Sequence, residues 1–168
     1  MSFDGSLLSF WEDGYTVFLV EKRMELGKPS TSPNYSTPFQ FILISSVHAI
    51  GYGSNEWVWA VGSPWGSISA KLNENRIHCY YHNNKILSSL SKTFINKKAI
   101  SLNGSDSALS RSIATTASGQ IARYIQSWTL NYYTGLISEI IIFARPLTTK
   151  ELENIHLYLS NKYKIKLE

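Results

Sequence analysis

The sequence predicts an all-β sandwich that ends in one short α-helix. Most of the 168 residues alternate between apolar and polar side chains with a period of two, and Gly, Pro, Asn and Ser interrupt the alternation. This pattern is typical of many short strands joined by turns. Only the end of the chain has helical spacing of apolar residues. A composition of 43% hydrophobic and 17% charged residues excludes a disordered chain, and the length fits one domain over residues 1–168.

Two early segments have the composition of buried strands. Tyr15–Glu21 is a run of β-branched and aromatic residues entered through the turn dipeptide Asp13-Gly14, so we expect a strand buried on both faces. Phe39–Val47 predicts another. Between them, Lys28–Pro38 holds three prolines, which predicts a surface loop because proline cannot donate to a strand ladder.

The segment from residue 65 to residue 82 predicts a hairpin. Trp65–Leu72 and Arg76–His82 both alternate, and the turn residues Asn73-Glu74-Asn75 separate them. Because successive side chains of a strand point to opposite faces, the alternation predicts Ile77, Cys79 and Tyr81 facing inward, and His78, Tyr80 and His82 on the opposite face.

Further short strands follow from the same alternation. They are expected at Glu56–Val61, Lys85–Leu90, Ala99–Leu102, Gln120–Ile125 and Leu136–Phe143. About ten short strands without intervening helices favour a sandwich over a fold of alternating strands and helices.

The helix signal lies at the C-terminal end. Thr148 and Glu151 have the spacing of a capping box, and apolar residues then recur at helical intervals at Leu152, Ile155, Leu159 and Tyr163. We expect a helix from about Thr149 to Tyr163 that lays its apolar stripe on a sheet.

The stretch from Gly135 to Tyr163 resembles the closing segment of concanavalin A-like, laminin G-type domains. It has a Gly-x-Ile-x-Glu start, an Arg-x-Leu turn at Arg145 and a helix ending in Tyr-Leu-x-x-Lys-Tyr. Shorter stretches are similar to other strands of that family: Phe3–Gly5, Tyr15–Arg23, Ile100–Gly104 and Gln120–Tyr124, with Ala122 where the family often has Gly.

This resemblance implies a concanavalin A-like jelly-roll β-sandwich of two antiparallel sheets with one short C-terminal α-helix. It also implies that residues usually found before Phe3 are missing, so the domain is expected to belong to a longer protein. The architecture hosts lectins, adhesion domains, glycosidases and viral surface proteins, so fold alone does not fix function.

The sequence lacks the carboxylate pairs that glycoside hydrolysis requires. The hydrolases of this architecture share a Glu-x-Asp-x-x-Glu strand, which is absent, and the chain has only three Asp. Glu139 is expected to pair with Arg145 across the following turn. No nucleophile elbow or phosphate loop occurs, and the single cysteine, Cys79, cannot form an internal disulfide. We therefore expect no enzyme.

Metal binding is not expected from the sequence. His78 and His82 share a strand face but stand about 13 Å apart, too far to hold one ion. Calcium needs several oxygen ligands, and Asp13 and Asp106 are the least unlikely candidates. No cofactor is predicted, with calcium as a minor alternative.

Aromatic residues are the strongest functional signal. Flat rings stack on sugar C–H surfaces while amides and hydroxyls bind the sugar hydroxyls. Rings and amides gather between residues 52 and 83 and again near Asn131 and Tyr133. Core packing is the alternative role, above all for Trp57 and Trp59. The candidate ligand-binding residues are Tyr52, Trp57, Trp59, Trp65, Tyr80, His82, Asn83, Trp128 and Tyr132.

These observations favour a non-catalytic carbohydrate-binding or adhesion module that holds a glycan or glycoconjugate by stacking and hydrogen bonds. The first alternative is a structural or decoration domain of a virion, tail fibre or cell-surface assembly that contacts neighbouring proteins. The second is an inactive or unusual glycoside hydrolase or lyase. The resemblance implies an extracellular, cell-surface or virion-surface location.

Charge and hydropathy limit the classes of binding partner that the sequence supports. The net charge is +4, and residues 61–135 carry eight Lys or Arg against two Asp or Glu, without the dense basic run of a nucleic-acid site. This excess would favour acidic or sulfated glycans. No apolar stretch reaches the length of a membrane span, the longest being Phe39–Ile50, so no membrane insertion is expected.

Overall fold

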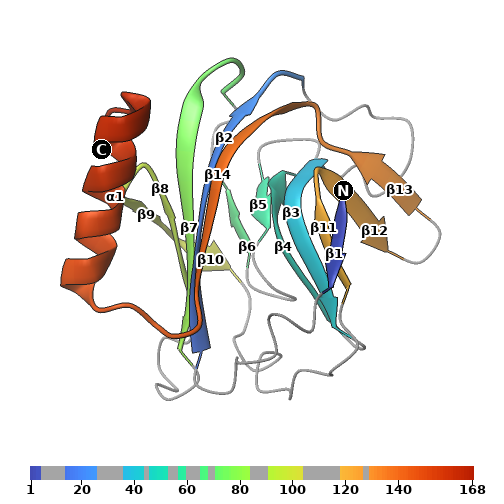
Figure 1. The fold of residues 1–168 in the computed structure, drawn as a ribbon, viewed down its shortest axis with the longest axis horizontal. Coiled ribbons are helices and arrows are strands. Elements are labelled where there is room, and N and C mark those ends of the chain that lie inside the picture. Colours follow the sequence, from blue (N-terminus) through green and yellow to red (C-terminus); the bar gives the residue numbers. More distant parts are fainter. Residues whose placement is uncertain are drawn as a thin grey trace.

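Two antiparallel sheets stack face to face, and the single C-terminal helix covers the outer face of one of them (Figure 1). The computed structural model describes residues 1–4, 14–25, 36–43, 46–52, 57–59, 65–67, 71–83, 91–103, 118–126 and 129–168. This arrangement confirms the predicted β-sandwich with one C-terminal helix.

Among the described residues, the helix-side sheet has five strands and the other sheet has seven. In spatial order, the first contains β14 (Gly135–Phe143), β2 (Gly14–Arg23), β7 (Asn75–Asn83), β8 (Ser91–Ile95) and β9 (Lys98–Ile100). The second contains β1 (Ser2–Asp4), β11 (Ser118–Ile121), β3 (Ser36–Leu43), β4 (Ser46–Tyr52), β5 (Trp57–Trp59), β6 (Trp65–Ser67) and β10 (Leu102–Asn103). A separate pair is formed by β12 (Arg123–Gln126) and β13 (Thr129–Tyr132), and α1 spans Thr149–Tyr163.

Strand β2 divides the apolar core into two layers, because alternate side chains of a strand point to opposite faces. Tyr15, Val17 and Leu19 pack between the two sheets together with Phe39 of β3. Phe18 and Val20 belong to a second layer under α1, with Ile77, Cys79, Leu147, Leu159 and Ile165. The prediction that this strand is buried on both faces is confirmed.

The hairpin predicted for residues 65–82 is wrong. Strand β6 pairs with β5 and β10 in the seven-stranded sheet, whereas β7 pairs with β2 and β8 in the five-stranded sheet. The turn residues are nevertheless present: Asn73 has a φ of 62°, and its N–H donates to the Arg23 carbonyl over 2.8 Å. Local alternation and turn residues do not encode which sheet the chain enters next.

Two segments predicted as single strands are divided in the structure. Phe39–Val47 contains parts of β3 and β4, which pair with each other and bring Leu43 opposite Ser46. Gln120–Ile125 is interrupted at Ala122, whose φ of 59° ends β11 and sends β12 into a different sheet. This left-handed conformation is one that favours glycine.

Other strand predictions have mixed outcomes. The structure confirms the strand predicted at Leu136–Phe143 as β14 and contains β5 within Glu56–Val61. Ala99–Leu102 is divided between the ends of β9 and β10.

The loop predicted at Lys28–Pro38 lies outside the described residues up to residue 35, and its end is wrong, because β3 begins at Ser36 and includes Pro38. The strand predicted at Lys85–Leu90 lies outside the described residues, and β8, which begins at Ser91, was not predicted.

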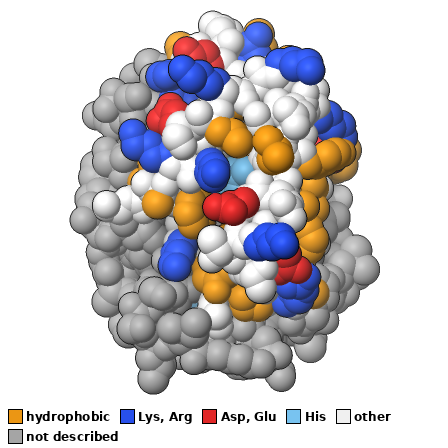
Figure 2. Space-filling model, turned by 90° about the vertical axis from the view of Figure 1, so that its left-hand side faces the viewer, with side chains coloured by type: hydrophobic (Ala, Val, Ile, Leu, Met, Phe, Trp, Pro, Cys, Tyr) orange, Lys and Arg blue, Asp and Glu red, His pale blue; other side chains and the backbone are white. Residues whose placement is uncertain are grey.

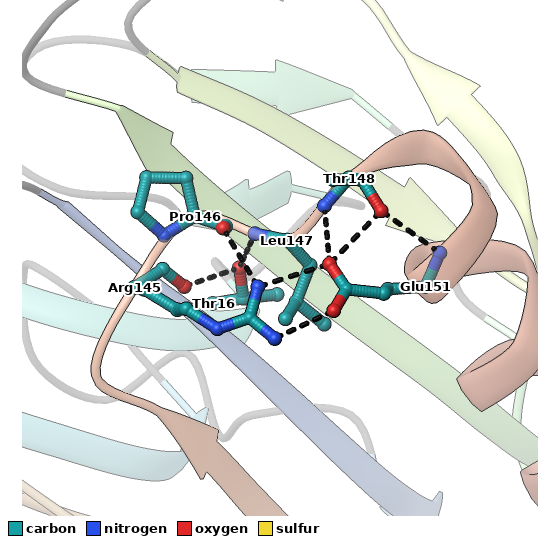
Figure 3. A network of polar contacts seen from close by, with 6 residues as sticks. All are labelled: Thr16, Arg145, Pro146, Leu147, Thr148 and Glu151. Carbon is teal, nitrogen blue, oxygen red and sulfur yellow. Dashed lines mark hydrogen bonds and ion pairs between the residues drawn. The ribbon is translucent and has the colours of Figure 1, made fainter.

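The capping box predicted at the helix N-terminus is confirmed. The Thr148 hydroxyl accepts the Glu151 N–H, and the Glu151 carboxylate accepts the Thr148 N–H over 2.8 Å. Arg145 adds two hydrogen bonds to the same carboxylate (Figure 3). The Arg145 guanidinium, assisted by Thr148, lowers the pKa of Glu151 to about 2. The hydroxyl of Thr16 accepts the Leu147 N–H and so ties this turn to β2.

The predicted ion pair between Glu139 and Arg145 is wrong, because Glu139 pairs with Lys162 of α1 at 3.1 Å. The ladder between β14 and β2 shifts register between Ile137 and Glu139. Ile137 consequently packs in the layer between the sheets, while Glu139 reaches the helix side. A bulge of this kind inverts the faces that simple alternation assigns.

His156 is the buried polar residue of the helix. Only 1% of it is exposed, and its Nδ1–H donates to the Leu152 carbonyl over 2.8 Å. The rings of Phe18 and Phe94 meet it edge to face. Burial lowers the pKa of His156 below its ordinary value of 6.5, and the charge of Lys97 acts in the same direction.

Replacing His156 by Gln removes this titrating group from the helix-side core. Since the folded protein holds the pKa of His156 below 6.5, the unfolded chain binds the proton more readily. The contribution of neutral His156 to stability is therefore fully present above pH 6.5, and it is lost as the pH falls from 6.5 through the lower pKa of the folded protein. Between about pH 7 and about pH 5, we expect the free energy of unfolding to fall more steeply for the wild type than for His156→Gln.

Urea unfolding at both pH values measures this difference. Comparing each protein with itself across pH cancels the constant cost of the substitution. Parallel pH dependences of the two proteins would contradict the prediction.

Candidate functional site

The topology gathers four of the predicted ligand-binding residues on three adjacent strands, β4, β5 and β6. Tyr52 ends β4, Trp57 and Trp59 delimit β5, and Trp65 begins β6. Tyr52 lies opposite Val58, and Trp59 lies opposite Trp65 in the ladder. Residues paired directly across a ladder share a face, so the positions of Trp57, Trp59 and Trp65 lie on one face of the sheet and that of Tyr52 lies on the other. We call the three tryptophans the aromatic ribbon. It belongs to the sheet that lies away from α1 (Figure 1).

The expectation that Tyr80 and His82 face outward is wrong. Their exposed fractions are 4% and 3%, and both rings pack against Tyr15, with centroid distances of 5.5 and 5.4 Å. The helix-side residues Ile77 and Cys79 are buried as predicted. One face of β7 is covered by α1 and the other by the second sheet. The alternating side chains of β7 are therefore buried on both faces, and the alternation does not mark a solvent-exposed face.

Burial between the sheets also changes the acidity of the packed tyrosine. Burial raises the pKa of Tyr15, and the neighbouring Tyr80 raises it further through its charge and a hydrogen bond. Asn83, at the end of β7, is partly buried and donates its amide to the Tyr81 hydroxyl over 3.0 Å. Tyr80 and His82 therefore pack in the core between the sheets and present no ring face to solvent.

The second predicted aromatic group is only partly a loop. Tyr132 ends strand β13 and is 67% exposed, while its neighbour Tyr133 is 7% exposed. Trp128 lies outside the described residues. Tyr132 is thus a predicted ring that is open to solvent.

A buried polar network that sequence reasoning missed includes Tyr133, the sequence neighbour of Tyr132. Glu21 of β2 has one carboxylate oxygen 2.8 Å from His78 Nε2, and the Tyr133 hydroxyl donates to the other. Glu21 and His78 are almost fully buried. Arg76, also buried, is the cross-strand partner of Glu21. Burying charge is costly unless it is paired and hydrogen-bonded.

The network connects three segments that are distant in sequence. It links β2 and β7 to the residues between β13 and β14. The Met24 N–H donates to the Thr134 carbonyl over 3.0 Å and extends the link through the backbone. The period-two pattern could have revealed the network, because Glu21 has the same parity as the core residues Tyr15, Val17 and Leu19.

We expect Tyr133→Phe to lower the free energy of unfolding by about 2 kcal/mol, because it removes a hydrogen bond to a buried carboxylate. The matched control is Tyr132→Phe, which removes the same hydroxyl from the exposed neighbouring ring and should change stability by less than about 0.5 kcal/mol. Urea unfolding of both variants measures the difference. Equal effects of the two substitutions would show that the buried hydroxyl contributes nothing specific.

Metal chemistry has no support in the described part of the chain. Among those residues, no three His, Cys, Asp or Glu side chains lie close enough together to hold an ion. The calcium candidates Asp13 and Asp106 fall outside them. The described helix is also too short and too polar to span a bilayer.

Comparisons with known proteins identify the fold. No protein-family model matches the chain, and no curated protein sequence matches it. Several solved structures share the architecture. The CBM40 domain of a Ruminococcus gnavus sialidase, bound to α2,3-sialyllactose, superposes with a TM-score of 0.63 at 9% identity, covering 93% of this chain and 92% of that one.

Two further structures match over most of this chain but less of their own. Domain 4 of an extracellular arabinanase from Geobacillus stearothermophilus, in complex with arabinotriose, has a TM-score of 0.60 and 19% identity, over 86% of this chain and 66% of that one. The binding domain of botulinum neurotoxin DC, in complex with rat synaptotagmin II, has a TM-score of 0.58 and 14% identity, over 88% and 36%. At these identities the likeness establishes the β-sandwich fold.

Proposed function

We propose that this chain is a non-catalytic carbohydrate-binding domain of the concanavalin A-like, laminin G-type class, and that the aromatic ribbon forms its glycan site. The observation that carries the proposal is that Trp57, Trp59 and Trp65 share one face of two neighbouring strands in the ladder. The solved complexes of similar domains with arabinotriose and sialyllactose support it. Trp128 and Tyr132 are proposed as a second stacking surface.

The chemistry of the ribbon suits a sugar. Indole rings stack on the C–H faces of a pyranose, and polar groups beside them bind the hydroxyls and fix orientation. Ser67, opposite Trp57 in the ladder, supplies such a hydroxyl on the neighbouring strand. Three tryptophans on two adjacent short strands give more stacking area than one sugar ring requires, which favours an oligosaccharide.

A binding role without catalysis is consistent with the described carboxylates. Glu21 is buried in the network with His78 and Tyr133, and Glu139 and Glu151 are committed to ion pairs with Lys162 and Arg145. Glycoside hydrolysis instead needs two carboxyl groups that face each other across a substrate cleft.

The proposed setting is a cell or virion surface, where a glycan or glycoconjugate would be the partner. The alternative from another class is a structural or decoration domain whose aromatic residues contact neighbouring proteins. The two proposals differ in whether the isolated domain binds sugar.

A glycan array with the purified domain, in the presence and absence of calcium, tests the proposal. We expect specific binding, followed by a loss of roughly tenfold or more in affinity for Trp59→Ala and for Trp65→Ala, because each removes a stacking ring. Tyr158→Ala, which removes an exposed ring from α1, is the matched control and should bind like the wild type. Calorimetric titration of the best glycan measures these affinities.

Folding must be checked in the same variants. Circular dichroism and thermal unfolding distinguish the loss of the binding site from the loss of the fold. If Trp59→Ala does not fold, Trp59→Phe replaces it, because this variant keeps an aromatic ring. A folded wild type that binds no glycan would overturn the proposal and favour the structural alternative.

A further inference from the structure

A hollow of about 680 Å³ lies beside the C-terminal end of α1. Its walls come from three segments: the turn that precedes β7, the turn between β8 and β9, and the residues that follow the helix. They contribute Lys71, Glu74, Asn75, Asn96, Lys164 and Lys166. The hollow is on the helix-side sheet and is separate from the aromatic ribbon, which belongs to the other sheet.

The two carboxylates of this hollow each have a lysine partner, and the oxygen of one amide accepts a backbone N–H. Glu74 pairs with Lys71 at 3.4 Å, and Glu168 pairs with Lys98 at 3.5 Å. The side-chain oxygen of Asn96 accepts the Ile77 N–H over 2.9 Å, which leaves its NH₂ group as a donor.

Three donor groups remain uncommitted. Within the described residues, neither Lys164 nor Lys166 has an ion-pair partner, and both are exposed. Together with the Asn96 NH₂ group, they leave the hollow with an excess of donors. A ligand that satisfies them must present acceptor oxygens, and anionic oxygens form the stronger, charge-assisted hydrogen bonds.

The walls of the hollow are held by backbone bonds. The Glu168 N–H donates to the Asn96 carbonyl over 2.9 Å, and the Asn96 N–H donates to the Ile77 carbonyl over 2.9 Å. Ile165 is buried in the helix-side core, and its carbonyl accepts the Ser160 hydroxyl over 2.6 Å. These bonds fix the backbone that carries the donor side chains.

We propose that this hollow is a second ligand site, which takes a small acidic saccharide through its carboxylate or sulfate group. The lysines would hold the anionic group, and the Asn75 and Asn96 amides would bind neighbouring hydroxyls. None of the residues that line the hollow is aromatic, so recognition depends on charge and hydrogen bonds rather than on stacking. The volume lies within the range of pockets for small ligands.

The surrounding surface favours a small ligand over a long polyanion. On the face that carries α1, basic side chains are separated from one another by acidic and apolar ones (Figure 2). A nucleic acid would need a continuous basic stripe. The site is independent of the aromatic ribbon, so either can fail without the other.

The test is a titration of the ¹⁵N-labelled chain with four probes, followed by NMR. Chondroitin 6-sulfate disaccharide carries sulfate and carboxylate, the unsulfated chondroitin disaccharide carries carboxylate alone, lactose is the neutral control, and sodium sulfate at matched ionic strength is the simple anion. We expect the acidic disaccharides to shift the amide signals of residues 71–75, 96–98 and 164–168, including the Asn96 side chain. Binding of the sulfated probe alone would identify sulfate as the recognised group.

Charge-matched variants separate a site from general attraction. The double variant Lys164→Gln/Lys166→Gln should weaken binding by roughly tenfold or more, since it removes two charge-assisted contacts. Lys92→Gln/Lys150→Gln, which removes two exposed lysines elsewhere, should leave the affinity unchanged. The positions of the shifted amides distinguish this site from the ribbon.

The proposal would be overturned by no binding of either acidic disaccharide, by equal shifts with lactose, by equal shifts with sodium sulfate, or by equal weakening in both double variants. If the two lysines serve only to neutralise the C-terminal end of the helix dipole, Lys164→Gln/Lys166→Gln would lower the melting temperature and leave binding intact. That result would overturn it as well.

Discussion

Burial of β2 on both faces is the constraint on which the rest of the structure depends. One face of this strand requires a second sheet and the other requires the helix, because apolar side chains on either side must be removed from water. Within this one strand, Phe18 packs under α1 and Tyr15 packs between the two sheets. The position of α1 follows, since the Thr16 hydroxyl binds the turn that leads into the helix.

The layer between the sheets changes character along β2. It is apolar around Val17 and Leu19 and becomes charged at Glu21, where His78 and Tyr133 complete the hydrogen bonds. A buried carboxylate must be hydrogen-bonded by specific partners, so this end of the sandwich depends on particular side chains. At the apolar core positions, another apolar side chain of similar volume would keep the fold stable. The exposed Tyr132 is consequently attached to a firmly anchored neighbour.

The two proposed ligand sites use different chemistry on different sheets. The aromatic ribbon offers rings for stacking on neutral sugar faces, and the hollow beside α1 offers donors for an anionic group. A domain with both could bind a glycan chain that carries neutral and acidic units, or two separate chains, since neither site uses residues of the other. Lys71, from the basic middle of the sequence, lines the hollow but pairs with Glu74, whereas Lys164 and Lys166 come from the C-terminal segment.

Local patterns in the sequence determined the buried strand β2, the strand β14 and the capped helix, because each depends on neighbours within one element: alternation, apolar spacing and the Thr148–Glu151 box. The resemblance of the closing segment added the jelly-roll arrangement. Only the tertiary structure decided that β6 and β7 separate into different sheets, that Glu139 meets Lys162, and that Tyr80 and His82 are enclosed. Those outcomes depend on which surface covers each face and on a bulge that inverts alternation, and neither is encoded in the spacing of nearby residues.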